Sequence, residues 1–216
     1  WRRRGAVAGG QFGGWGGVSA DAPGVLGQVG GSASTAAVYV RVTPAGLSSG
    51  VAVPEFAKGK SISNLISMKL VGGKIQAKVS AGSARIVMDV SGYFSARAGA
   101  SFTPLSPARV FLGKATTTTR LAQIAGLGGV PADATAVMVN VGVSAPTAAG
   151  YVRVTPAGLN SGVAVQEFAK GKSISNLMSM KLVGGKIQVK VSAGSAGIVM
   201  DVSGYFSARA LGTTTG

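Results

Sequence analysis

Residues 39–98 read YVRVTPAGLSSGVAVPEFAKGKSISNLISMKLVGGKIQAKVSAGSARIVMDVSGYFSARA, and residues 151–210 repeat this stretch with five substitutions. The repeat period is 112 residues, and a weaker match at the same offset relates residues 16–29 to residues 128–141. An identity of this length indicates an internal duplication. A repeat with a fixed period indicates the domain organisation directly.

The duplication divides the chain into two modules, each large enough to fold alone. The first module has a Gly-rich and degenerate start, WRRRGAVAGGQFGGWGG. A segment that contains Pro104 and Pro107 separates the two copies and is typical of a linker. Because the sequence begins at Trp1 rather than Met, we expect a processed chain or a fragment. The predicted organisation is module one at residues 1–98, a linker at residues 99–112, module two at residues 113–210 and a tail at residues 211–216.

Apolar and polar residues alternate inside each module, and a period of two is the signature of a β-strand. Val137, Val139, Val141 and Val143 form one such apolar face, and residues 151–155 form another strand. Helical periodicity is not evident anywhere. We therefore predict an all-β fold of two tandem antiparallel modules, each a β-sandwich or a small barrel.

The Gly184–Gly185 pair lies between two alternating segments, residues 174–182 and residues 186–191. A Gly-Gly pair accepts positive φ and favours a two-residue hairpin loop. This register predicts that Leu182 faces Ile187 on an apolar face, while lysines occupy the opposite face. Module one repeats the same pattern.

The charge balance is strongly basic, with 21 Lys and Arg against 6 Asp and Glu, a net charge of +15. Such a field favours polyanions such as teichoic acids, acidic glycans, anionic headgroups or nucleic acid. A contribution to solubility alone is the alternative. Nucleic acid is disfavoured, because aromatic residues are not interleaved with the lysines.

The sequence contains no Cys and no His. Disulfides, thiolate nucleophiles and Cys/His metal sites are therefore excluded. The six carboxylates stand apart in sequence, whereas acid–base catalysis usually needs His or paired carboxylates. We expect no enzymatic activity and no cofactor. No apolar run reaches the ~18 residues of a membrane-spanning helix, so we expect no membrane span.

Three stretches of module two carry a recognisable pattern: GVPADATAVMVNVGVSAPTAAGYVRVTPAG (129–158), FAKGKSISNL (168–177) and KIQVKVSAGSAGIVMDVSGYF (186–206). The pattern resembles a repeat of secreted and cell-wall proteins of actinobacteria. The segment PLSPAR (104–109) looks like the entry to that repeat, but Val110 follows it where the repeat continues with Asp-Thr-Arg, and module one lacks the segment. The resemblance implies an extracytoplasmic β-module without catalysis, found in tandem or attached to secreted enzymes.

The lysines of the predicted hairpin and of the segment before it are the main candidate contact residues. One interpretation is that edge lysines prevent strand-to-strand aggregation. The other is that they form a repeated basic patch for an anionic partner or a neighbouring subunit. The candidates are Lys58, Lys60, Lys69, Lys74, Lys78, Lys170, Lys172, Lys181, Lys186 and Lys190.

The first strand of module one has Gly27 and Gly31 where module two has valines. Each missing side chain should leave a hole that costs on the order of 1–3 kcal/mol unless it is filled. We hypothesise that Phe12 and Trp15, or a segment of an adjacent chain, fill this hole. These four residues are therefore the candidate assembly segment, since strand addition at a weakened sheet edge joins chains.

Taken together, these features predict a secreted or cell-surface structural protein, the building block of a filament or surface layer. Its expected partner is a second copy of itself, because repeated surfaces can form open head-to-tail contacts. The alternative is a binding module of a secreted protein, with an anionic cell-wall polymer or acidic glycan as its partner.

Overall fold

The computed structural model describes residues 8–48, 51–95, 99–159 and 164–208. Every regular element in these ranges is a β-strand. The strands of module one are β1 (Ala8–Gln11), β2 (Gly24–Ser32), β3 (Val38–Pro44), β4 (Val51–Phe56), β5 (Ile62–Lys69), β6 (Lys74–Val79) and β7 (Arg85–Phe94). Those of module two are β8 (Ala100–Thr116), β9 (Arg120–Gln123), β10 (Ala136–Ser144), β11 (Gly150–Pro156), β12 (Ala164–Phe168), β13 (Ile174–Lys181), β14 (Lys186–Val191) and β15 (Ser195–Ala208).

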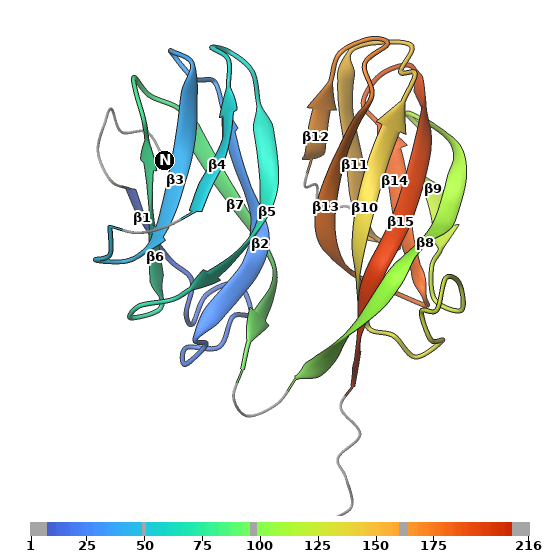
Figure 1. Ribbon diagram of the computed structural model, residues 1–216, viewed down its shortest axis with the longest axis horizontal. Helices are drawn as coiled ribbons and strands as arrows, with labels where there is room; N and C mark the ends of the chain where they lie inside the picture. The colour runs from blue at the N-terminus through green and yellow to red at the C-terminus, as the bar shows by residue number, and fades with distance from the viewer. Residues whose placement is uncertain (1–7, 49–50, 96–98, 160–163, 209–216) are drawn as a thin grey trace, which may run out of the picture.

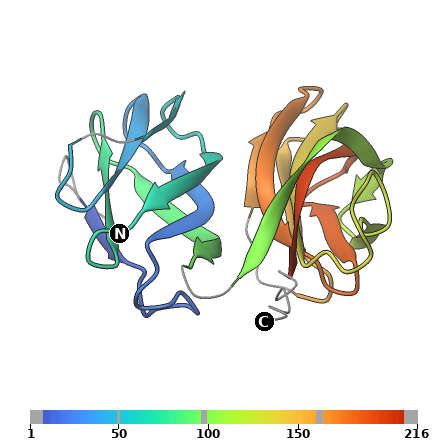
Figure 2. The same cartoon turned by 60° about the horizontal axis from the view of Figure 1, so that its bottom comes forward.

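Each module is a sandwich of two antiparallel sheets (Figures 1 and 2). In module one the sheets have the strand orders β1-β6-β3-β4 and β5-β2-β7. In module two they have the orders β12-β11-β14-β9 and β13-β10-β15-β8. The predicted all-β fold of two tandem sandwich modules is therefore confirmed. The two copies differ by one strand, because β8 has no counterpart beside β7 in the described part of module one.

The core of each module lies between its two sheets and is built by strand alternation. On β10, Val137, Val139, Val141 and Val143 are all at most 2% exposed, while the residues between them are half-buried. The predicted valine face is therefore the buried face. Burying such side chains contributes roughly 1.5–3 kcal/mol each, so the sandwich depends on this pattern.

The predicted hairpin is wrong beyond its turn. Gly184 and Gly185 do adopt positive φ (57° and 73°), and Val183 pairs with Lys186 across them. The two strands then separate, because β13 joins the sheet of β10 whereas β14 joins the sheet of β11 and β9. The turn is thus an arch between sheets. The apolar side chains of β13 and β14 therefore enter the same core from opposite sheets, where a flat hairpin would have placed both in one layer.

The predicted linker at residues 99–112 is also wrong, because most of it belongs to β8. This strand pairs with β15 from Ala100 opposite Ala208 to Thr116 opposite Ser195, with two interruptions of the register. Pro104 and Pro107 are tolerated because β8 is an edge strand, where a missing N–H can face solvent.

The hole expected at Gly27 and Gly31 is closed by module one itself. A Cβ at Gly31 would lie 2.6 Å from the Phe56 ring, and one at Gly27 would lie 2.6 Å from the backbone oxygen of Asp89. Phe12 packs against the core as a partly buried residue, whereas Trp15 is 69% exposed. The cavity-filling part of the hypothesis is therefore wrong, because a close backbone approach and a neighbouring ring replace the missing valines.

The two modules lie side by side, with β5 and β2 of module one next to β13 of module two (Figure 1). Two side-chain amides join them. Gln28 Nε2 donates to the backbone oxygen of Leu177 at 2.9 Å, and Asn176 Nδ2 donates to the backbone oxygen of Ser63 at 2.9 Å. Both acceptors lie on edge strands of their sheets, so the contact uses backbone groups that no neighbouring strand occupies.

We expect Met200→Ala to destabilise the chain by about 2–5 kcal/mol, because Met200 is 0% exposed. Its counterpart Met88 is only partly buried, so Met88→Ala should cost clearly less. Calorimetric unfolding of the two variants beside the parent chain makes the comparison. Equal shifts in Tm would show that β7 is covered in solution as well as β15.

Candidate interaction surfaces

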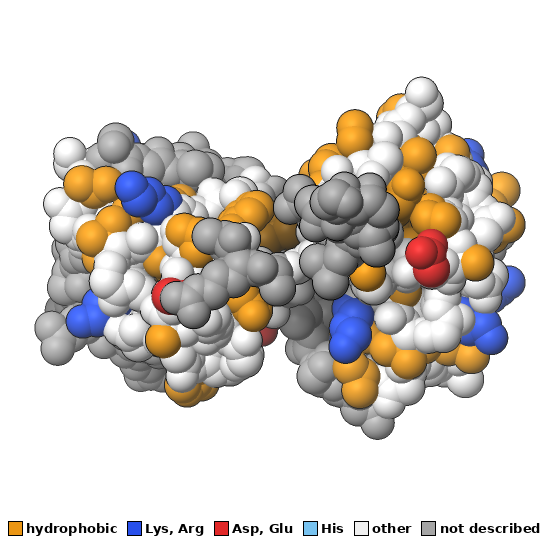
Figure 3. All heavy atoms as spheres, turned by 90° about the horizontal axis from the view of Figure 1, so that it is seen from below, with side chains coloured by type: hydrophobic (Ala, Val, Ile, Leu, Met, Phe, Trp, Pro, Cys, Tyr) orange, Lys and Arg blue, Asp and Glu red, His pale blue; other side chains and the backbone are white. Residues whose placement is uncertain are grey.

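The ten candidate lysines do not form one patch. Lys69 and Lys181 end β5 and β13, in one sheet of each module, while the lysines of β6 and β14 lie in the opposite sheet. Four others are in the turns that precede β5 and β13, namely Lys58, Lys60, Lys170 and Lys172. Figure 3 likewise shows cationic side chains in separate groups. This separation follows from the arch that replaces the predicted hairpin. The two strands that flank the arch belong to different sheets, so their lysines do too.

A cationic row on the outer face of β11 and β14 is the most organised of these groups. Arg153 on β11 is directly opposite Lys190 on β14. The Arg153 guanidinium carbon lies 5.5 Å from the centre of the Tyr151 ring, and Nη2 donates to the Tyr151 hydroxyl at 3.3 Å. Arg153 Nε is buried without a hydrogen-bond partner among the described residues. Like charges directly opposite each other are unfavourable, so a bound anion would reduce the repulsion between Arg153 and Lys190.

Gln188 fixes the other end of the row. Its Nε2 donates to Thr155 Oγ1 at 2.9 Å and to the backbone oxygen of Leu159 at 2.6 Å, and its Oε1 accepts from the N–H of Gly158 at 3.1 Å. These bonds hold the loop after β11 against β14. The polar groups beside Arg153 are therefore held in place by hydrogen bonds within the module.

A shallow hollow of about 160 Å³ adjoins the row. Its lining combines two cations, hydroxyl groups and one aromatic ring, and contains no carboxylate. This chemistry suits an oxyanion or an acidic sugar, since charged donors bind the oxygens and the ring contacts an apolar face. The lining residues are Thr117, Tyr151, Arg153, Lys190, Val191 and Ser192.

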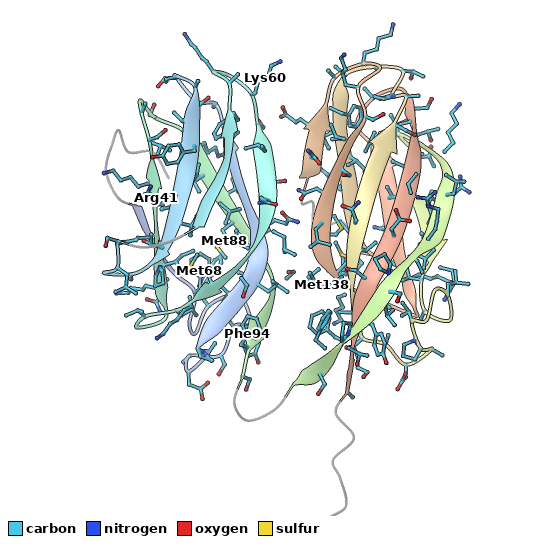
Figure 4. The ribbon with its side chains drawn as sticks, viewed as in Figure 1. Arg41, Lys60, Met68, Met88, Phe94 and Met138 are labelled. Carbon is cyan, nitrogen blue, oxygen red and sulfur yellow. The ribbon has the colours of Figure 1, made fainter. Side chains whose placement is uncertain are left out.

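Module one repeats the row. Arg41 is opposite Lys78, and its guanidinium carbon lies 5.9 Å from the centre of the Tyr39 ring. In Figure 4, Arg41 projects from the side of module one that faces away from module two. We call Tyr39, Arg41 and Lys78, together with Tyr151, Arg153 and Lys190, the cationic rows. Lys78 and Lys190 were predicted as contact residues. The Tyr and Arg partners were missed, although strict alternation in YVRVT already places them on one face.

The second surface is the free edge of β7. In module two, β15 is covered along its edge by β8, and Arg109 Nε donates to Asp201 Oδ1 at 2.9 Å. In the described part of module one no strand pairs with that side of β7. Asp89, the counterpart of Asp201, has no ion pair there, and its partial burial raises the pKa of its carboxyl group.

The inward side chains of β7 reflect the missing cover. On β15 the three central apolar side chains are 0% exposed, whereas their counterparts on β7 are only partly buried at the margin of the core. The covered residues are Ile198, Met200 and Val202, and their counterparts are Ile86, Met88 and Val90. In the described part of module one, the core is therefore less well covered at this edge. We call the unpaired side of β7 the open edge.

Catalytic and metal chemistry finds no support in the described ranges. They contain no cluster of three or more His, Cys, Asp or Glu side chains. The absence of enzymatic activity stays a prediction, since this observation does not test it. Within the described residues, no helix is long and apolar enough to cross a membrane.

No protein-family model matches the sequence, and no curated protein matches it either. The likeness to actinobacterial secreted repeats therefore stays a prediction. Among solved structures, the chain is similar to the major capsid protein P2 from bacteriophage PM2, at 10% identity and a TM-score of 0.25, over 95% of this chain and 94% of that one. This TM-score is too low to carry an argument. The fold and its surfaces define the chain as a tandem β-sandwich protein with duplicated cationic rows.

We expect Asp89→Asn to raise the Tm at neutral pH, because it removes a carboxylate whose charged form is disfavoured by burial. A raised carboxyl pKa means that the folded state binds the proton more tightly. The penalty is therefore full above the raised pKa and disappears as the pH falls toward the ordinary value of 3.8. The gain in Tm should shrink over the same range. Asp201→Asn makes the same charge change beside Arg109 and should give no gain at neutral pH.

Proposed function

We propose that this chain is an extracellular structural protein, a building block of a filament or surface layer that assembles through its repeated β-modules. The observation that carries the proposal is the duplicated cationic row. The same Tyr, Arg and Lys occupy the same strand positions in both modules. A repeated surface offers repeated contacts to a polymer or to neighbouring copies, as an extended assembly requires.

Net charge decides which contacts are favourable. At +15, copies of the chain repel one another, because only six carboxylates stand against 21 Lys and Arg. An anionic polymer of the cell surface removes this repulsion and presents its charges at regular intervals. The proposal therefore places the chain on such a polymer, which orders the copies along it.

The alternative is a wall-binding or acidic-glycan-binding module that does not assemble. The hollow beside Arg153 favours binding. The buried Arg153 Nε has no hydrogen-bond partner among the described residues, and with the adjacent hydroxyl groups it suits an oxyanion. Both functions use the same rows. They differ in whether bound copies form an ordered array.

We expect purified chain to stay dispersed at low salt and to form ordered filaments or sheets when teichoic acid is added. Negative-stain electron microscopy and sedimentation velocity measure this, with neutral dextran as the control polymer. Binding without any ordered array would contradict the structural role and support the alternative. Absence of binding would contradict both.

We expect Arg153→Gln and Arg41→Gln each to weaken teichoic acid binding by roughly 0.2–1 kcal/mol, because each removes the row cation that would pair with a phosphate of the polymer. Binding of the parent chain should also weaken as NaCl is raised. Lys181→Gln, at the end of β13 in the opposite sheet, is the matched control for loss of charge. If this control weakens binding as much as the row variants, net charge rather than the rows determines binding.

A further inference from the structure

Large apolar side chains are exposed to solvent at the same three turns of both modules. Single exposed apolar residues are common on protein surfaces and need no explanation. Here, however, each exposed residue of one module has an exposed counterpart 112 residues away in the other. The exposure is therefore a property of the repeated module. The six side chains are between 39% and 69% exposed, and they are Trp15, Leu47 and Val71 in module one and Leu127, Leu159 and Val183 in module two.

Strand pairing brings these three turns to one end of each module. β6 begins opposite the ends of β1 and β3, and β2 begins opposite the end of β5. The turns that follow β1, β3 and β5 therefore lie together, and these are the turns that carry Trp15, Leu47 and Val71. We call this end, with the equivalent end of module two, the apolar end. At the opposite end, the turns at residues 33–37, 57–61 and 80–84 contain only Ala, Ser, Thr, Gly and Lys.

The backbone holds the apolar side chains in fixed positions. The Trp15 N–H donates to the backbone oxygen of Phe12 at 3.1 Å, and the Trp15 oxygen accepts from the Val18 N–H at 3.0 Å. Leu127 makes the equivalent bonds at 3.1 and 2.9 Å. The glycines beside both residues have positive φ, which such a tight turn requires. These turns keep a large apolar side chain in water outside the core, so its burial is left to a binding partner.

The apolar ends of the two modules point in the same direction. Gln28 is opposite Leu65 in module one, and its side chain reaches Leu177, the counterpart of Leu65. Asn176, one residue earlier on β13, reaches Ser63, two residues earlier on β5. The two hydrogen bonds thus join equivalent levels of the modules, and β5 and β13 run in the same direction. In Figure 1 the apolar ends are the lower ends of both modules.

Cationic side chains accompany the apolar ones at this end. Exposed lysines precede and follow the turns of Val71 and Val183, and the four are Lys69, Lys74, Lys181 and Lys186. The two carboxylates of Asp21 and Asp133 lie in the turns before β2 and β10. Phe94, 49% exposed at the end of β7, adds an aromatic ring (Figure 4). Figure 3 views the molecule from this end and shows hydrophobic side chains on both modules, with basic ones beside them.

We propose that the apolar end binds the surface of an anionic lipid bilayer. The six apolar side chains enter the boundary between headgroups and acyl chains, and the lysines beside them contact the acidic headgroups. The ring of Trp15 is suited to this boundary, because it combines a large apolar surface with one N–H donor. The inference goes beyond the proposed function, since the cationic rows lie on the outer faces of the sheets and stay free for a polymer.

A flat anionic surface fits this end better than a second copy of the chain. Both modules reach a flat surface at once, so the turns of both contribute to a single binding event. If two apolar ends met, the four lysines of each copy would approach those of the other, with only Asp21 and Asp133 to offset them. Like charges across an interface are unfavourable. Acidic headgroups instead attract all four lysines.

The test mixes the full-length chain with vesicles of phosphatidylcholine alone or of equal parts phosphatidylcholine and phosphatidylglycerol. Cosedimentation should show binding to the anionic vesicles and much weaker binding to the neutral ones. The chain has two tryptophans, so Trp1→Phe leaves Trp15 as the sole tryptophan emitter. Its emission should shift to the blue on anionic vesicles and be quenched by brominated acyl chains. Absence of binding or of the shift would overturn the proposal. Because no polymer is present, the result is independent of the assembly test.

Trp15→Ser should weaken binding to the anionic vesicles by at least about tenfold, because it removes a large apolar side chain from the contact. Its side chain is 69% exposed, so the Tm should hardly change. Leu112→Ser is the matched control, since Leu112 is 71% exposed on β8 away from this end. Equal effects of the two variants on vesicle binding would show that the apolar end is not the surface used, and would overturn the proposal.

A charge variant tests the role of the lysines. Lys74→Gln should weaken binding by roughly fivefold, whereas Lys60→Gln makes the same charge change at the opposite end and should have little effect. Loss of vesicle binding in Arg153→Gln but not in Trp15→Ser would assign the binding to the cationic rows and overturn the proposal. Sedimentation without vesicles addresses a second copy as the occupant. Self-association that disappears in Trp15→Ser would identify that occupant instead of the bilayer.

Discussion

The burial of one apolar face per sheet is the constraint on which the rest of this structure depends. Within each module two sheets turn their alternating valine, isoleucine and methionine side chains toward each other, and the residues between them face outward. Because side chains alternate with a period of two, a shift by one residue would move every apolar side chain to the surface. The outer positions are free of this constraint. The cationic rows therefore occupy them without a cost to the core.

Strand pattern and fold class could be predicted from the sequence because they depend on local alternation. The valines at residues 137–143 define their strand without knowledge of a partner. The path between sheets could not be predicted in this way. Gly184–Gly185 has the same local preference for positive φ in a hairpin and in an arch, and only the distant partners β10 and β11 distinguish the two. The prolines of β8 were misleading for a related reason, because they signal a linker unless the strand is known to lie at an edge.

The candidate surfaces were predicted in part. Lysines stand out in the sequence by charge, but a charge count does not say which of them share a face. The rows needed the pairing of β11 with β14, which places Arg153 opposite Lys190. Tyr151 was within reach of sequence reasoning, since its distance of two residues from Arg153 puts both side chains on one face of a strand. The open edge was not within reach of sequence reasoning, because the sequence of a strand does not show whether a neighbouring strand pairs with it.

Because the chain is duplicated, equivalent residues of its two modules can be compared directly. Asp89 and Asp201 have the same neighbours in sequence, yet one lies at an open edge and the other is held by an arginine of β8. The same contrast separates Gly92 from Gly204 and Met88 from Met200. The residues of each pair are identical and could make the same contacts. Only those on β15 do so, because β8 lies beside them. Since the residues from Ile86 to Phe94 are identical to those from Ile198 to Phe206, the two edges differ, within the described part of the chain, in their cover and not in this stretch of sequence.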